Sequence, residues 1–397
     1  MRITLVIAGL GGGGAERTCV NLANAWAARG YHATIVTISQ NARTPAYEID
    51  PRVAHRDVEW PRWAKWNELN PAAIAPVLRG LQEARCSELI HDITIIALLR
   101  YAILSTRPDV VVSVIDRTNV RVLAAMQGTG VPVIACEQTD ARRISLRGWQ
   151  GAREALYRHA GAVVAPDPAI AQWLAARGAP ATAIPNPLVA PPPREVAHAG
   201  TRRRIVTLAR LSAEKRPEFL VRSFASICGH YPDWDLEVYG IGPQRNSLEH
   251  LGEKLVPVGR IRFCGFSTDP YAVLANADLF VSASWVEGFG NAIWEALACG
   301  VPVVAMDAGP AVRSLVRDEV DGLIVKENSM AALASALAEL MGDEVKRKAC
   351  AARAPEILTR FSMESALEKW DALLAAVVGR APWFNREAES VCMKRSG

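Results

Sequence analysis

The chain has 397 residues, of which 50% are hydrophobic and 22% are charged, so its composition is that of a folded globular protein and not of a disordered one. This length exceeds one ordinary hydrophobic core and predicts two domains of somewhat under 200 residues each. The basic excess lies in residues 1–190, with 20 Lys and Arg against 15 Asp and Glu, which fits an anionic ligand or membrane surface and excludes a typical nucleic-acid binder.

The cysteines and the apolar runs predict a cytoplasmic protein. Eight cysteines are scattered without a C-x-x-C pair or a His at zinc spacing, so we expect reduced thiols. The apolar run after Met1 is short and leads into glycines, which indicates a first strand and not a signal peptide. Arg100 and Arg107 interrupt the best candidate for a membrane span, around Ile93–Leu104, so we expect no spanning helix.

The N-terminus reads as strand, glycine turn, helix and strand. Ile3–Ala8 and His32–Ile38 are the apolar runs, and this order is typical of a parallel sheet. The turn Gly9–Gly14 satisfies the dinucleotide fingerprint G-x-G-x-x-G. That fingerprint also needs an acidic residue at the end of the second strand, and none occurs between Glu16 and Glu48. An NAD-dependent oxidoreductase using this loop is therefore kept only as an alternative.

An irregular segment follows, with aromatic and basic residues close together. It contains Trp60, Arg62, Trp63, Lys65 and Trp66. Tryptophans at an apolar–water boundary and cations over anionic lipid are the parts of an interfacial anchor, so we predict peripheral membrane contact. The alternative is that these tryptophans pack on the domain and the charges are solvated. A helical region is expected after this segment.

Two further buried-type strands extend the first sheet. Asp109–Val114 and Val131–Cys136 are joined by a predicted helix. Asp116 and Glu137 follow them, at the carboxyl ends of strands where open α/β sheets bind their ligands. Asp167-Pro168 predicts an N-cap followed by proline in the first turn of another helix. The first half therefore predicts a doubly wound parallel sheet.

The second half begins again with a strand and a charged loop. A proline-rich stretch within 189–203 predicts a linker, and Arg204–Ala209 predicts the first strand beyond it. Arg210 and Lys215 follow this strand, and Pro217 opens a helix. At this edge of a sheet, an arginine fork and a lysine point charge are well placed to hold a diphosphate.

The most informative stretch runs from Trp285 to Pro302 and predicts a strand end, a glycine loop, a helix and another strand. Gly288 and Gly290 allow the backbone to approach a ligand, and Asn291 is predicted to be the N-cap of a helix ending at Ala298. Such a helix start presents free N–H groups and a positive dipole end. It therefore suits a phosphate.

Two carboxylates, Glu287 and Glu295, flank this helix start with seven residues between them. Carboxylates repel phosphate but are good paired acceptors for the vicinal hydroxyls of a sugar or ribose. This pair, followed by a helix and a CGVPVV-like strand, resembles the donor-site signature of retaining GT-B glycosyltransferases of family 4. The resemblance implies that Glu287 holds the transferred sugar and Glu295 the ribose. It implies further donor contacts from Gly288, Phe289, Gly290 and Asn291.

Other motifs resemble the same family. The turn G-G-x-E-R is similar to the family's first loop, which implies that Gly13 and Gly14 approach the acceptor and donor phosphate. The family pattern G-R-L-x-x-x-K matches with Ala209 in place of the glycine. This match implies that Arg210 and Lys215 stabilise the leaving nucleotide diphosphate.

Two positions depart from this picture or compete with it. Many family members have a histidine near the reacting sugar where this chain has Glu137, so its predicted role is either catalytic or that of a structural or acceptor-positioning carboxylate. Asp233-Trp234-Asp235 has the D-x-D spacing of metal sites in a different glycosyltransferase fold. Because it precedes a strand at its amino end, away from the ligand edge, we interpret it as a surface turn and expect no metal.

The resemblance implies an α/β protein of the GT-B fold, with two Rossmann-like, doubly wound parallel-sheet domains facing a cleft. The expected ranges are 1–188 for the acceptor side, 189–203 for the linker, 204–361 for nucleotide-sugar binding, and 362–397 for a helix crossing back to the first domain and a tail. The implied reaction is retaining, cofactor-free transfer from a nucleotide diphosphate sugar, with UDP favoured, to a hydroxyl of a lipid-linked glycan in cell-surface polysaccharide synthesis. The alternatives are a GT-B sugar-nucleotide epimerase and a catalytically inactive scaffold.

Overall fold

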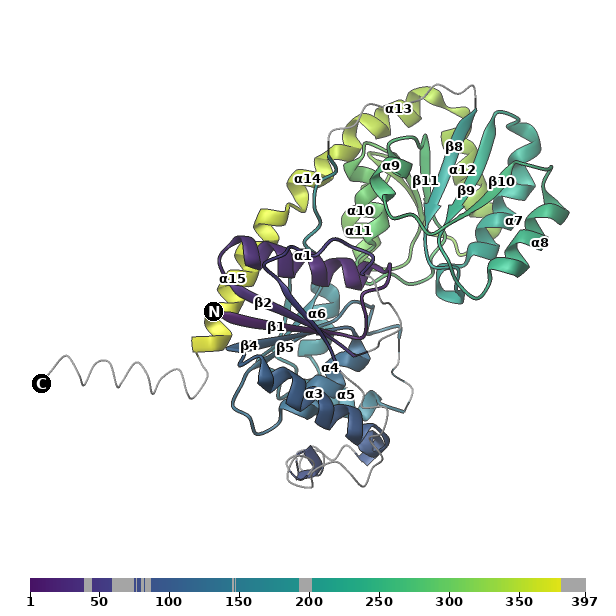
Figure 1. Cartoon of the computed structure of the whole chain (residues 1–397). Coiled ribbons are helices and arrows are strands. Elements are labelled where there is room, and N and C mark those ends of the chain that lie inside the picture. The colour runs from purple at the N-terminus through teal and green to yellow at the C-terminus, as the bar shows by residue number, and fades with distance from the viewer. Residues whose placement is uncertain are drawn as a thin grey trace, which may run out of the picture. The chain divides into compact units, whose positions relative to one another are not determined.

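The computed structural model describes residues 1–38, 45–58, 75, 77–79, 82, 87–144, 146, 148–192 and 202–379. The predicted membrane anchor, Trp60 to Trp66, lies outside them. The chain divides into two compact units (Figure 1): unit 1 is Met1–Pro187 with Glu364–Gly397, and unit 2 is Leu188–Met363. The first domain was predicted to end at residue 188 with a linker after it, whereas the division between units falls directly after Pro187.

Unit 1 contains a seven-stranded parallel sheet in the order β3-β2-β1-β4-β5-β6-β7. Its strands are β1 Arg2–Ile7, β2 His32–Thr37, β3 Ala54–Asp57, β4 Val110–Val114, β5 Val133–Cys136, β6 Ala162–Ala165 and β7 Ala181–Ala183. Its helices are α1 Gly14–Ala28, the 3-10 helix η2 Ser87–Asp92, α3 Ile93–Ser105, α4 Asp116–Met126, α5 Gln150–Tyr157, α6 Pro168–Ala175 and α15 Met363–Gly379. The central strands β1, β4 and β5 are buried along almost their whole length, which explains their predominantly apolar sequences.

Two local features of unit 1 follow directly from the sequence. The carboxylate of Asp167 accepts a hydrogen bond from the Ala169 N–H at 2.8 Å, and Pro168 is the first residue of α6, so the predicted cap is confirmed. The helix α15 packs on α1, since the Trp370 ring meets the Trp26 ring edge-on with 5.5 Å between centroids. Apolar packing thus ties the last described helix to the first one.

Unit 2 contains a six-stranded parallel sheet in the order β10-β9-β8-β11-β12-β13. Its strands are β8 Arg203–Leu208, β9 Trp234–Tyr239, β10 Ile261–Gly265, β11 Leu279–Ser282, β12 Val303–Met306 and β13 Gly322–Val325. Its helical segments are η3 Ala213–Lys215, α7 Pro217–Ile227, η4 Cys228–His230, α8 Arg245–Leu255, α9 Pro270–Leu274, α10 Asn291–Ala298, α11 Pro310–Leu315, α12 Met330–Gly342, α13 Glu344–Arg353, η5 Ala354–Glu356 and α14 Ile357–Arg360.

Helices cover both faces of this second sheet (Figure 1). One core packs α7, α8 and α12 against the sheet through residues such as Phe224, Leu248 and Leu337. A separate core packs α10 and α11 through residues such as Trp294 and Leu315. Both sheets are parallel with helices between their strands, so the predicted class of two doubly wound α/β domains is confirmed.

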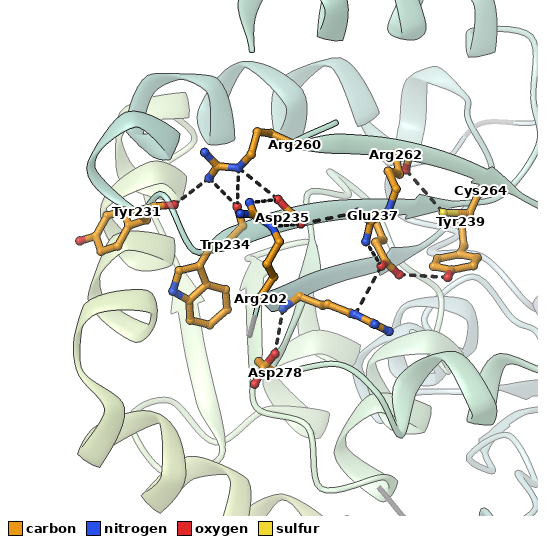
Figure 2. Close-up of polar contacts among 11 residues, drawn as sticks. Arg202, Tyr231, Trp234, Asp235, Glu237, Tyr239, Arg260, Arg262, Cys264 and Asp278 are labelled. Carbon is orange, nitrogen blue, oxygen red and sulfur yellow. Dashed lines mark hydrogen bonds and ion pairs between the residues drawn. The ribbon is translucent and has the colours of Figure 1, made fainter. Parts of the chain in front are cut away.

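The predicted surface turn at Asp233–Asp235 is wrong for Asp235. This residue lies inside β9 and is 2% exposed. Its carboxylate accepts hydrogen bonds from the guanidinium groups of Arg202 at 2.6 Å and Arg260 at 3.1 Å, and Arg262 lies 3.5 Å away (Figure 2). Burial alone would raise the pKa of Asp235, but the hydrogen bonds and charge of Arg202, together with Arg262 and Arg260, hold it below its usual value.

Candidate active site

The first loop of the candidate site follows β8. Arg210 is exposed, and among the described residues its side chain has no hydrogen bond or ion pair. The Ser212 hydroxyl donates to the Glu214 carboxylate at 2.6 Å, and the Lys215 N–H donates to the Ser212 carbonyl at 3.0 Å. These bonds fold the loop back on itself, so Lys215 is held at a fixed position of a short helical turn.

The second loop follows β11 and ends at α10. The expected N-cap, Asn291, is wrong: Gly290 is the N-cap, and Asn291 is the first helical residue. Gly290 has φ 98°, a left-handed conformation that glycine adopts without a steric penalty. Its carbonyl accepts from the N–H groups of Ile293 and Trp294 at 2.9 and 3.0 Å. The helix ends at Ala298, as predicted.

The structure joins these two loops. The backbone N–H of Trp285 donates to the Glu214 carbonyl at 3.1 Å. The Lys215 ammonium donates to Glu287 Oε1 at 2.6 Å, within an ion pair whose side chains are 24% and 14% exposed. The guanidinium of Arg216 lies 5.9 Å from the centre of the Trp285 ring. The cation of the first motif and the first carboxylate of the second are therefore neighbours.

The second motif also contains Gly288, Phe289 and Glu295, and all three are buried. Gly288 lies buried in the loop between Glu287 and α10. The ring of Phe289 is 4% exposed and packs edge-on against Phe361 at 5.9 Å, so this side chain anchors the loop in the unit 2 core. Glu295 lies in α10, one turn beyond its start, and is 5% exposed.

The glycine loop of unit 1 is fixed by a tyrosine that belongs to none of the predicted motifs. The Tyr47 hydroxyl donates to the Gly13 carbonyl at 3.2 Å, and the Arg17 guanidinium lies 4.8 Å above the Tyr47 ring. Gly13 is the N-cap and Gly14 the first residue of α1. A Cβ atom added to Gly13 would lie 2.2 Å from a carboxylate oxygen of Glu16, so a larger residue requires that side chain to move.

Glu137 is fully buried at the end of β5. Its Oε1 atom accepts a hydrogen bond from the Tyr157 hydroxyl, which in turn accepts from the Asn119 side-chain amide at 3.1 Å. Burial raises the pKa of Glu137 to about 7, against the opposing effects of the Arg153 charge and the Tyr157 hydrogen bond. This geometry favours a structural or positioning role over direct contact with a substrate.

The structure also bears on metals and membranes. Across the described ranges, no group of three or more His, Cys, Asp and Glu side chains has a geometry that would hold a metal ion. The oxygens of Asp235 already accept hydrogen bonds from arginines. No helix in the described part of the chain combines the length and the apolar character of a membrane span.

Comparison with protein families gives two matches that together cover most of the chain. Residues 193–357 match the family "Glycosyl transferases group 1". Residues 13–187 match "Glycosyl transferase 4-like domain". Each match corresponds closely to one structural unit, and the second ends where unit 1 gives way to unit 2.

Curated relatives are also glycosyltransferases in most cases. A GalNAc-GalNAc-diNAcBac-PP-undecaprenol alpha-1,4-N-acetyl-D-galactosaminyltransferase of Campylobacter jejuni is 24% identical over 95% of this chain and 99% of its own length. The lipopolysaccharide core glycosyltransferase LpsE of Rhizobium meliloti is 32% identical over 43% of this chain and 49% of its own. An exopolysaccharide phosphotransferase of Streptomyces coelicolor is 32% identical over 48% of this chain and 20% of its own. The chain thus spans a half or less of most curated relatives that it matches.

Solved structures with the same fold cover nearly the whole chain. TarM of S. aureus, in a complex that contains UDP, matches with a TM-score of 0.76 at 14% identity over 94% of this chain and 99% of that one. HepE of Anabaena, in complex with UDP-glucose, matches with a TM-score of 0.73 at 20% identity over 95% and 100%. At these identities the likeness shows the fold, which is GT-B as predicted.

Proposed function

The chain belongs to the GT-B glycosyl transferases of group 1, and from this premise we propose that it is a family 4 enzyme that transfers a sugar with retention of configuration. The donor is a nucleotide diphosphate sugar and the acceptor a hydroxyl of a glycan. UDP is the favoured nucleotide, since the structures of TarM and HepE contain UDP or UDP-glucose.

The observation that carries this proposal is the ion pair between Lys215 and Glu287. It brings together one residue from each of two motifs, of which the first is assigned by resemblance to the diphosphate and the second to the transferred sugar and the ribose. Arg210 follows the same strand as Lys215 and is exposed to a ligand. Glu295 lies one helical turn beyond Asn291, where it would hold the ribose of the nucleotide.

The proposed chemistry uses the leaving diphosphate itself as the base. The bond between the sugar's anomeric carbon and the phosphate oxygen breaks, and the acceptor oxygen bonds to that carbon from the same face. The acceptor's proton passes to the leaving phosphate oxygen. Arg210, Lys215 and the N–H groups at the start of α10 stabilise the developing negative charge, and each such donor contributes roughly 3 kcal/mol. No metal or cofactor takes part in this route.

The acceptor that we propose is a lipid-linked glycan, used in cell-surface polysaccharide synthesis at the cytoplasmic face of the membrane. The C. jejuni relative that aligns over its full length is named for an undecaprenol-linked substrate, and LpsE is named for lipopolysaccharide core synthesis. The tryptophan-rich segment near residue 63 supplies the proposed peripheral membrane contact.

A binding screen tests the donor class. UDP, GDP, ADP and their common sugars are added to the protein, and the melting temperature is recorded, since a ligand that binds only the folded state stabilises it by mass action. We expect UDP and at least one UDP-sugar to raise the melting temperature. Stabilisation by NAD but by none of these nucleotides would contradict the proposed function and favour the oxidoreductase alternative.

A further inference from the structure

Lys215 and Glu287 neutralise each other at the proposed donor site. Their charged atoms are 2.6 Å apart, and both side chains are mostly buried, so water and salt screen the attraction weakly. The proposed function assigns them to different parts of the donor, the lysine to the diphosphate and the glutamate to the sugar hydroxyls. In the observed arrangement the two side chains bind each other instead.

The backbone on both sides of the pair is held by hydrogen bonds. The Lys215 N–H donates to Ser212, and the Glu287 N–H donates to the Ala308 carbonyl at 3.3 Å. The bond from Trp285 to the Glu214 carbonyl joins the two loops. The Arg216 side chain donates to the Asn328 amide oxygen and so links the first loop to the segment before α12. Opening of the pair therefore requires rotation of two side chains and no rearrangement of the loops.

We propose that this ion pair is a latch that the donor's diphosphate opens. Phosphate oxygens compete with the Glu287 carboxylate for the Lys215 ammonium, because both are anionic acceptors for the same donor group. Once Lys215 turns to the phosphate, the Glu287 carboxylate is free to accept hydrogen bonds from sugar hydroxyls. Sugar recognition then depends on diphosphate binding. This inference rests on the proposed function and adds an order of events to it.

An alternative role for Glu287 is to hold Lys215 in the position that binds phosphate. The latch and this alternative predict opposite changes in the affinity for a nucleoside diphosphate when the Glu287 charge is removed. If the pair is a latch, removal of the Glu287 charge frees Lys215 and raises the affinity for a nucleoside diphosphate. If Glu287 is a support for Lys215, the same change lowers that affinity. A nucleoside diphosphate without a sugar is the discriminating probe, since it has no hydroxyls of the transferred sugar for Glu287 to bind.

Isothermal titration with UDP, and with GDP and ADP if UDP does not bind, tests the latch in the full-length chain. We expect Glu287→Gln to bind the diphosphate about three- to tenfold more tightly than the wild type and to discriminate less between UDP and a UDP-sugar. Lys215→Met is expected to weaken binding tenfold or more. Adding Glu287→Gln to Lys215→Met is expected to give no further increase in affinity. Such non-additivity is typical of two residues that interact directly.

Glu218→Gln is the matched control. Glu218 lies three residues after Lys215, at the start of α7, and its exposed carboxylate pairs with Arg222 of the same helix at 2.9 Å. The control variant loses the same single charge and leaves the Lys215–Glu287 pair intact, so we expect its UDP affinity to stay within twofold of the wild type. An equal gain in Glu218→Gln and Glu287→Gln would mean that net charge alone sets the affinity, and this would overturn the latch.

The remaining outcomes separate the latch from the function on which it rests. Nucleotide binding by the wild type with unchanged or weaker binding by Glu287→Gln overturns the latch and leaves the proposed function in place. Absence of binding by all three nucleotides overturns the proposed function and the latch with it. If Glu287→Gln melts below the assay temperature, Glu287→Asp replaces it: this variant withdraws the carboxylate from the Lys215 ammonium and is also expected to bind UDP more tightly.

Discussion

The backbone N–H of Trp285 donates to the carbonyl of Glu214 at 3.1 Å. This bond joins the loop after β8 to the loop after β11, which are distant in the sequence but follow strands that are hydrogen-bonded neighbours in the unit 2 sheet. Because both loops leave the carboxyl edge of this sheet, the sheet order alone places Arg210, Lys215 and Glu287 in one region.

Arg210→Ala is expected to lower turnover at saturating donor by about a hundredfold or more, because a charged donor to the leaving phosphate is lost. The side chain is exposed, so the fold and the melting temperature should not change. Steady-state kinetics with the cognate UDP-sugar measure the effect. Arg222→Ala is the control, since Arg222 is also exposed and pairs with Glu218 on α7. Near-normal turnover of Arg210→Ala would show that Arg210 does not stabilise the leaving phosphate.

Gly290→Ala is expected to destabilise the protein by about 1–2 kcal/mol, the cost of a left-handed conformation for a residue with a Cβ atom. The added atom would also lie 3.3 Å from the Leu315 side chain. Thermal unfolding measures the loss as a fall in the melting temperature of several degrees. Gly229→Ala is the control, because a Cβ atom there meets nothing within 4 Å. Equal melting temperatures for the two variants would contradict the strain argument.

The buried Glu137 is expected to make the protein less stable as the pH rises. Its pKa is about 7 in the folded chain, while an unfolded glutamate titrates near 4.5, so between these values the folded state holds a proton that the unfolded state has released. The stabilisation is complete below pH 4.5 and is lost as the pH rises through 7, by roughly 3 kcal/mol in total.

Denaturant unfolding of the wild type and Glu137→Gln at pH 5 and pH 8 measures this effect. The neutral amide removes the titration, so we expect the variant to lack this part of the pH dependence. Tyr157→Phe, which removes the hydroxyl that donates to Glu137, is expected to raise the carboxyl pKa and so to enlarge the loss of stability between pH 5 and pH 8. The same pH dependence in the wild type and Glu137→Gln would show that Glu137 is not buried in its neutral form.

The sequence predicted those elements whose signal lies within a few neighbouring residues. The strands predicted at His32–Ile38 and Asp109–Val114 were placed to within one residue, and the cap at Asp167 was placed correctly, because apolar runs and an Asp-Pro pair are local patterns. The partners of Asp235 could not be predicted, since Arg202 and Arg260 come from other segments and only the sheet brings them to its carboxylate (Figure 2).

The candidate site was predictable in its motifs but not in its contacts. Spacing identified Lys215 and Glu287 separately, and their ion pair follows from the order of strands in the sheet. The N-cap was assigned to Asn291 on side-chain chemistry, whereas the backbone requires a left-handed residue one position earlier, at Gly290. Tyr47 lies in no motif and was therefore missed.

The tryptophan-rich segment predicts salt-dependent binding to anionic vesicles. Each basic residue near such a surface contributes about 1 kcal/mol, and this attraction is screened by salt. Flotation with phosphatidylserine vesicles compares the wild type with a variant carrying Trp63→Ala, Lys65→Ala and Trp66→Ala, and with Lys348→Ala as the control for loss of charge. We expect only the triple variant to lose binding. If neither the wild type nor the triple variant floats with the vesicles, the membrane proposal is wrong.

The central claim is metal-independent transfer with retention, and proton NMR of the reaction products tests it most directly. The protein is incubated with a UDP-sugar and a glycan or lipid-linked acceptor in the presence of EDTA, and the anomeric coupling of the first product formed is recorded. We predict release of UDP and a product with the same anomeric configuration as the donor. An inverted product, or turnover that EDTA abolishes and magnesium or manganese restores, would contradict this account.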